Sequence, residues 1–244
     1  MIPRRPLAVT VGLLLAAAAA SLPAAGPPLA AQRVTFRTDD EVVLAASWYE
    51  PSSRPAPAVI LLHMLSRSRR DWEPVASRLA AEGVGALAVD FRGHGDSTGQ
   101  LAGGPAPDYT ALLLDVKAAR RYLATRGDVQ PSRVGLAGAS LGANVAALHA
   151  AGDAAIISLA LLSPSLDYRG LRIEQALRQF GARPALLVGS NDDPYAARTV
   201  RELEKSGGGL REPLILDQAG HGTLMLARDA DLARRLVDWF KRTL

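Results

Sequence analysis

From residue 32 onward, short and continuous apolar runs alternate with amphipathic stretches. An unbroken apolar run bounded by turn residues is typical of a strand that is buried on both faces of a sheet. A hairpin-like pair, 34–36 and 42–49, comes first, around a turn at Asp39 and Asp40. Buried strands are then predicted over 59–62, 84–89, 134–137, 156–162, 185–188 and 214–216.

The stretches between these strands carry helical periodicity. Leu112, Val116, Ala119 and Leu123 fall on one face of the segment 108–126, which therefore predicts an amphipathic helix. Strands that alternate with helices predict an α/β fold, a mostly parallel sheet with helices on both faces and its site at the carboxyl ends of the strands. Further helices are expected over 74–82, 141–151, 194–205 and 229–242.

The amino-terminal segment has the parts of a secretory signal. Arg4 and Arg5 precede the apolar stretch 7–22, and small residues follow at 24–26. We expect residues 1–31 to be a signal peptide or an uncleaved anchor plus spacer, and residues 32–244 to be one catalytic domain. The protein is therefore expected to be exported, to the periplasm or beyond the cell, with membrane contact only through this segment.

Composition and charge exclude several classes of function. The chain has 48% hydrophobic and 21% charged residues, which is ordinary globular composition. Loss of Arg4 and Arg5 with a cleaved leader would lower the formal charge from +4 to +2, too little to indicate a nucleic-acid partner. The cysteine count is 0, which excludes a disulfide framework, a thiolate metal site and a cysteine nucleophile.

The segment 138–142 reads Gly-Ala-Ser-Leu-Gly and matches the G-x-S-x-G pattern. It follows an apolar strand and opens a helix, which is the strand-turn-helix context of a nucleophile elbow. This context favours Ser140 as a nucleophile over a plain loop with a helix-capping serine.

With these residues the chain from Val34 to Leu244 resembles the α/β-hydrolase family. The resemblance rests on 138–142, on the turn Asp90–Ser97, on Leu62-His63 ahead of Trp72, and on Gly220-His221-Gly222. It implies a triad in the chain order serine, acid, histidine, with His221 as the general base. It also implies that His63, His94 and the turn Asp90–Ser97 shape the site rather than take part in catalysis.

The triad acid is expected after the strand 185–188, where two aspartates are adjacent. Asp193 fits the family pattern through Ser190 and Pro194, whereas Asp192 fits only through Gly189. We favour Asp193 and keep Asp192 as the alternative. The other aspartate should face solvent or cap the following helix.

The oxyanion hole should combine the backbone N–H groups of Leu65 and Leu141. Here the chain departs from the family, since Met64 stands where glycine usually follows the histidine. Nearby, Arg67, Arg69 and Arg70 form a charge run that we interpret as a solvated face rather than as an anion site.

About twenty residues separate the strands 156–162 and 185–188, where the family often inserts a lid. We therefore expect no large lid, an open cleft, and a likeness to small esterases and dienelactone hydrolases. The expected activity is cleavage of a small-molecule carboxylic ester through an acyl-enzyme, without cofactor or metal. A serine peptidase, an acyltransferase and an inactive hydrolase fold that serves as a binding module are the alternatives.

Overall fold

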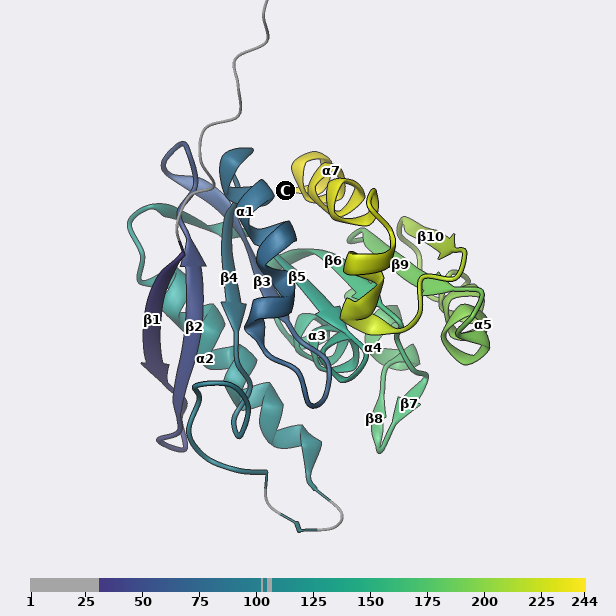
Figure 1. The fold of residues 1–244 in the computed structure, drawn as a ribbon, viewed down its shortest axis with the longest axis horizontal. Helices are drawn as coiled ribbons and strands as arrows, with labels where there is room; N and C mark the ends of the chain where they lie inside the picture. Colours follow the sequence, from purple (N-terminus) through teal and green to yellow (C-terminus); the bar gives the residue numbers. More distant parts are fainter. Residues whose placement is uncertain (1–30, 102, 105–106) are drawn as a thin grey trace, which may run out of the picture.

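The computed structural model describes residues 31–101, 103–104 and 107–244 (Figure 1). One sheet has the strand order β1-β2-β4-β3-β5-β6-β9-β10. β2 is antiparallel to both of its neighbours, and every pair from β4 to β10 is parallel. The strands are β1 (Gln32–Arg37), β2 (Val43–Tyr49), β3 (Ala56–Leu62), β4 (Gly85–Val89), β5 (Val129–Ala139), β6 (Ile156–Leu162), β9 (Ala185–Ser190) and β10 (Arg211–Leu216).

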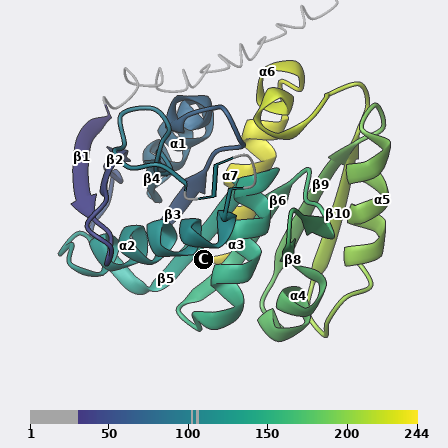
Figure 2. The same cartoon turned by 90° about the horizontal axis from the view of Figure 1, so that it is seen from below.

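Helices cover both faces of the sheet (Figure 2). One layer comprises α1 (Glu73–Ala81) and α7 (Leu232–Thr243); the other comprises α2 (Leu112–Ala124), α3 (Leu141–Gly152), α4 (Glu174–Phe180) and α5 (Pro194–Leu203). In β3, Ile60 packs into one apolar core and Leu61 into the other, and both are fully buried. The predicted α/β-hydrolase architecture is thereby confirmed.

The helices begin and end close to the predicted positions, with one clear difference. The predicted helix 108–126 begins as the 3₁₀ turn η2 (Tyr109–Ala111), and α2 itself starts at Leu112. The Asp108 side chain accepts a hydrogen bond from the N–H of Thr110 and so caps this turn rather than an α-helix. Three other short elements lie near the site: η1 (Arg69–Trp72), η3 (Gly222–Leu224) and α6 (Met225–Arg228).

Residues 163–184 connect β6 to β9 above the sheet edge, and we call this connection the excursion. It is small, as predicted. It contains the two-residue strands β7 (Asp167–Tyr168) and β8 (Leu171–Arg172), followed by α4. Asn144 of α3 holds it in place, donating hydrogen bonds of 2.8 Å to the carbonyl oxygens of Ser165 and Leu171. The protein therefore has no large lid in this part of the chain.

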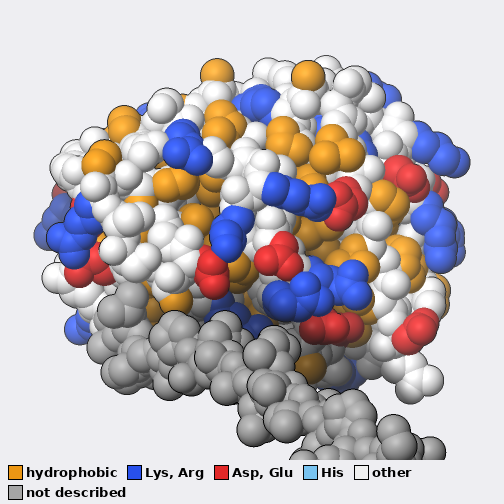
Figure 3. Space-filling model, turned by 90° about the horizontal axis from the view of Figure 1, so that it is seen from above, with side chains coloured by type: hydrophobic (Ala, Val, Ile, Leu, Met, Phe, Trp, Pro, Cys, Tyr) orange, Lys and Arg blue, Asp and Glu red, His pale blue; other side chains and the backbone are white. Residues whose placement is uncertain are grey.

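Basic and acidic side chains are interspersed on the face shown in Figure 3. Within the described ranges, no helix combines the length and the apolar character needed to cross a bilayer. Residues 1–30 of the expected leader and spacer lie outside the described residues, so export and the boundary at residue 31 stay predictions.

Candidate active site

Ser140 occupies a sharp turn between β5 and α3, and its backbone has φ 50° and ψ −115°. A non-glycine residue rarely adopts such a positive φ. The flanking glycines make the turn possible. A Cβ on Gly138 would lie 2.1 Å from the carbonyl oxygen of Gly142, and one on Gly142 would lie 2.5 Å from that of Leu62. The close approach of α3 to β5 therefore requires Gly138, and its close approach to β3 requires Gly142.

The turn is anchored by the strand next to it. The N–H of Ser140 donates a 2.8 Å hydrogen bond to the carbonyl oxygen of Leu162, the last residue of β6. Ser140 is 8% exposed, so its hydroxyl lies near the surface of an otherwise buried turn. No hydrogen bond joins Ser140 Oγ to His221 among the described residues, as is common in hydrolases without substrate.

His221 and Asp193 are joined directly. His221 Nδ1 lies 2.5 Å from Asp193 Oδ2, and the ring is 44% exposed at the carboxyl edge of the sheet. A carboxylate in this position fixes the imidazole tautomer, leaving Nε2 as the free nitrogen. Asp193 also caps α5, since its Oδ1 accepts a 3.3 Å hydrogen bond from the N–H of Ala196.

Asp192 is exposed to solvent, as expected of the second aspartate, and does not cap α5. Its Oδ1 also accepts hydrogen bonds from the hydroxyl of Ser190 and from the N–H of Gly220, the latter at 2.9 Å. Asp192 thus holds the residue that precedes His221. This additional contact arises because the loop 217–222 folds back over the end of β9, which no local pattern reveals.

The loop that carries His221 is fixed on both sides of the imidazole. The N–H of Gly222 donates a 2.9 Å hydrogen bond to the hydroxyl of Ser163, which directly follows β6. Gly222 has φ 60°, and a Cβ there would lie 2.6 Å from Met64 Sδ. The Met64 side chain therefore packs against the His221 loop from the loop after β3.

The two N–H groups predicted for an oxyanion hole lie at the ends of adjacent strands. Leu65 follows β3 and Leu141 begins α3, and within the described residues neither N–H donates to an acceptor. The positive φ of this loop falls on Ser66, at 61°, and not on Met64. Glycine is therefore not required at position 64, and methionine is accommodated.

Two histidines support the Leu65 loop through hydrogen bonds of their ring nitrogens. His63 is fully buried; its Nδ1 lies 2.7 Å from the carbonyl oxygen of Met64, and its Nε2 accepts a 3.0 Å hydrogen bond from the N–H of Phe91. Burial lowers the pKa of His63 to about 4, so the ring is neutral near pH 7. His94 Nε2 accepts a longer bond, 3.4 Å, from the N–H of Ser66.

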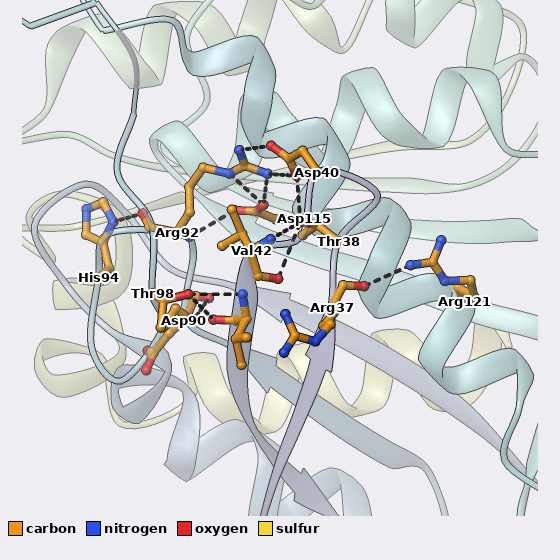
Figure 4. A network of polar contacts seen from close by, with 12 residues as sticks. Arg37, Thr38, Asp40, Val42, Asp90, Arg92, His94, Thr98, Asp115 and Arg121 are labelled. Atoms are coloured by element: carbon orange, nitrogen blue, oxygen red, sulfur yellow. Dashed lines mark hydrogen bonds and ion pairs between the residues drawn. The ribbon is translucent and has the colours of Figure 1, made fainter.

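The turn Asp90–Ser97 is architectural. Buried Asp90 accepts hydrogen bonds from the N–H of Arg69 at 2.7 Å and from the N–H of Asp96 at 2.9 Å. Arg92 extends away from the site and bridges Asp115 and Asp40 (Figure 4). The turn thus ties the Leu65 loop to β2 and α2 without supplying a reacting group.

The interpretation of the arginine run as a solvated face is wrong for one of its three members. Arg69 is 6% exposed and pairs with Asp90 and Asp96. Arg67 forms a bidentate pair with Asp71, with both distances 2.8 Å, whereas Arg70 is exposed. Asp71 also accepts a hydrogen bond from the Thr223 hydroxyl and so joins the Leu65 loop to the His221 loop.

Sequence reasoning missed the residues that position His221, the candidate general base. Ser163, Ser190 and Thr223 hold the His221 loop through their hydroxyl groups. The sequence offered only their position, at the end of a strand or close to the histidine. This position is weak evidence for a role in the site, because serine and threonine are common residues. In the described part of the chain, no group of three or more potential ligands forms a metal site.

Comparison with known proteins agrees with the fold. A family model described as Hydrolase_4, serine aminopeptidase, S33, matches residues 53–202. The chain belongs to this α/β-hydrolase family. The match covers β3 to α5 and thus includes the loops of Leu65, Ser140 and Asp193.

Curated relatives of this hydrolase are similar over about half of the chain. The Mycobacterium tuberculosis protein Rv2307c, which is uncharacterized, is 34% identical over 131 residues, covering 52% of this chain and 44% of the relative. The quorum-quenching protein AidA of Acinetobacter baumannii is 35% identical over 136 residues, covering 54% and 44%. The chain therefore spans less than half the length of these relatives.

Solved structures share the fold over most of the chain. A dienelactone hydrolase from Anabaena variabilis has a TM-score of 0.73 at 21% identity and covers 88% of this chain and 99% of its own. The Pyrococcus furiosus esterase Pf2001 has a TM-score of 0.70 at 21% identity, and the likeness covers 88% of this chain and 91% of the esterase. At these identities the likeness concerns the fold.

Proposed function

We propose that this hydrolase is a serine esterase that cleaves small-molecule carboxylic esters with Ser140, His221 and Asp193 as its triad. The observation that carries the proposal is the 2.5 Å contact between Asp193 and His221 at the sheet edge where Ser140 stands at a positive φ. The resemblance of the fold to an esterase and a dienelactone hydrolase supports ester substrates.

The reaction proceeds by acyl transfer. Ser140 Oγ attacks the ester carbonyl carbon while His221 Nε2 takes the hydroxyl proton, and Asp193 stabilises the imidazolium that forms. His221 then gives this proton to the alkoxide oxygen of the leaving alcohol as the ester bond breaks. Water, activated by His221, attacks the acyl-enzyme and releases the carboxylic acid.

The oxyanion of each tetrahedral intermediate is held by the N–H groups of Leu65 and Leu141. Both groups are free of other acceptors within the described residues, so they are available without rearrangement. Leu141 opens the twelve-residue helix α3, whose dipole adds positive potential at this end. Hydrogen bonds that exist before the reaction starts need no reorganisation energy during it.

A fluorophosphonate tests the nucleophile directly, because it forms a covalent adduct with an activated serine. We expect wild-type protein to be labelled on the peptide that contains Ser140. Ser140→Ala should lose labelling and about 10⁴-fold or more in ester turnover while it stays folded. Labelling that persists in this variant would refute the assignment of the nucleophile.

A serine peptidase acting on short peptides is the second candidate, favoured by the description of the matching family model. An aminopeptidase needs a carboxylate to hold the substrate ammonium group. In the excursion above α3, however, Asp167 pairs with Arg172 and Glu174 pairs with Arg178, at 2.8 and 2.9 Å. Rates on aminoacyl anilides and on matched aminoacyl esters separate the two, and we expect ester cleavage to dominate.

A further inference from the structure

A hollow of about 530 Å³ lies between the chain segment that follows Leu65 and the one that follows His221, and neither Ser140 nor His221 lines it. Its volume is within the range of small-molecule sites. One wall comes from Arg67 just before η1, from Asp71 of η1 and from Pro74 at the start of α1. The other comes from η3 and α6, with Thr223, Leu224 and Leu226.

The hollow is bounded by the same two chain segments that carry the proposed catalytic groups. Arg67 is two residues beyond Leu65, and Thr223 is two residues beyond His221. The segments meet where the Thr223 hydroxyl donates to Asp71, and both of these residues line the hollow. The hollow therefore borders the seam between the oxyanion loop and the His221 loop.

The chemistry of acyl transfer places the alcohol part of an ester on the side of His221 that borders the hollow. The carbonyl oxygen must point at the N–H groups of Leu65 and Leu141, and the leaving oxygen must face His221, which protonates it. The alcohol attached to that oxygen then extends from His221 along the seam. The acyl chain leaves the carbonyl carbon in a different direction.

The polarity and charge of the residues that line the hollow indicate which alcohols would fit it. Most of the surface is apolar, contributed by residues such as Pro74, Leu224 and Leu226. Four charged side chains line the hollow: Arg67 is paired with Asp71, and Arg70 and Glu73 add one charge of each sign. The charges of the lining therefore balance, and the net charge favours neither a cationic nor an anionic alcohol.

We propose that this hollow is the binding site for the alcohol part of the ester, and that the preferred substrates carry a neutral, mainly apolar alcohol of medium size. The inference rests on the proposed esterase function, because it assumes that His221 protonates the leaving group. Each methylene that enters the hollow should raise kcat/KM by roughly two- to fourfold until the space is filled.

Two series of substrates test the assignment. The first consists of methyl, butyl, octyl and benzyl acetate, which differ only in the alcohol and all give the same acetyl-enzyme. The second consists of methyl acetate, butyrate and octanoate, which differ only in the acyl group. In the wild type, kcat/KM should rise along the first series.

The variant Ala227→Trp places an indole in the hollow from the exposed face of α6. Ala154→Trp is the matched control, because Ala154 is exposed just before β6, at the opposite edge of the sheet. We expect Ala227→Trp to reduce kcat/KM for octyl and benzyl acetate by about tenfold or more and to leave the methyl esters unchanged. The control should change neither series.

Several outcomes would overturn the inference. A loss confined to the acyl series would mean that the hollow holds the acyl group, and an equal loss on all esters would indicate disturbance of the triad. No loss at all would mean that the substrate does not enter the hollow. In each case the esterase function stands, whereas absence of turnover on both series by the wild type would refute the function itself.

Discussion

At the scale of single residues, the two adjacent aspartates differ in whether their role needs a negative charge or only a hydrogen-bond acceptor. Asp193 contacts His221 Nδ1, where the proposed mechanism requires its negative charge during attack, whereas Asp192 accepts hydrogen bonds that an amide oxygen can also accept. We predict that Asp193→Asn loses roughly 10³- to 10⁴-fold in kcat and that Asp192→Asn stays within about tenfold of wild type.

Steady-state kinetics on both variants at matched folding decide between the two aspartates. The reverse ranking would move the acid to Asp192 and keep the mechanism. Two mild variants would mean that the acid lies elsewhere. Asp192→Ala is an informative third variant, because it removes the acceptor for the N–H of Gly220 and should release the loop that carries His221.

His63 provides a second prediction, for the pH dependence of stability. Its pKa falls from an ordinary value of 6.5 to about 4 because burial penalises the charged ring. The unfolded chain therefore binds a proton that the folded protein does not, so stability should decrease as the pH falls from about 6.5 to 4 and level off below that. The shift corresponds to about 3 kcal/mol in all.

Urea unfolding at pH 7 and pH 4.5 measures this effect. His63→Gln should be less stable than wild type at pH 7 but should lose less stability on acidification. His149→Gln is the matched comparison, because burial lowers that pKa too while Asp153 opposes the shift, so the variant should remove a smaller part of the pH dependence. An unchanged pH dependence in His63→Gln would contradict the assignment.

Site residues could be predicted from the sequence where a short run of neighbouring residues identifies them. Ser140 lies in a motif of five consecutive residues, and Asp193 precedes a proline that begins a helix, so local sequence was enough to propose both as site residues. Asp71, Ser163 and Thr223 act across contacts between distant segments, for example over 152 residues from Thr223 to Asp71. No local pattern encodes such a pairing.

At the scale of elements, the close packing of α3 on β3 sets the position of Ser140, the proposed nucleophile. A Cβ at Gly142 would lie 2.5 Å from the carbonyl oxygen of Leu62 and 2.6 Å from that of His63. Backbone atoms cannot move aside as a flexible side chain can. Gly142→Ala should therefore cost more than about 2 kcal/mol of stability and should also reduce kcat by displacing Ser140 and Leu141.

Gly152→Ala is the matched control, because Gly152 ends the same helix and a Cβ there meets no atom within 4 Å. Alanine should leave stability unchanged or raise it by up to about 1 kcal/mol. Urea unfolding and ester kinetics on both variants measure the two effects. Equal stability of the two variants would show that α3 can shift away from β3 at little cost.

The elements themselves were well predicted because buried parallel strands are continuous apolar runs and the helices have a single apolar face. The differences occur where side-chain contacts override local propensity, as at Asp108, which caps a 3₁₀ turn ahead of α2. The hairpin of β7 and β8 has two residues per strand and is too short to give any periodicity. Its place is fixed by Asn144 of α3.

At the scale of the whole molecule, the expected leader allows us to predict where in the cell the protein is found. Arg4, Arg5 and the apolar stretch 7–22 favour export. Fractionation of cells that express the full chain should find it outside the cytoplasm, with a mature amino terminus between Ala25 and Arg33. Cytoplasmic protein that retains residues 1–22 would contradict export, and membrane-bound protein that retains them would indicate an anchor.

The small excursion over the sheet edge determines which esters the whole molecule should prefer. Lipases that are activated at an oil–water interface move a lid to expose apolar surface. Here the excursion is pinned to α3 by Asn144, and its side chains Ile173, Leu177 and Phe180 are buried, so it cannot move without unpacking the core.

We therefore predict a preference for soluble esters with short acyl chains. Rates on ethyl esters from acetate to palmitate, measured below and above the solubility limit of each ester, test this prediction. The rate should decline with acyl length and should not rise when an emulsion forms. A jump in activity at the appearance of the oil phase would mean that the excursion opens after all. In that event, replacing Asn144 with Ala should enhance the jump, because it removes the hydrogen bonds that hold the excursion closed.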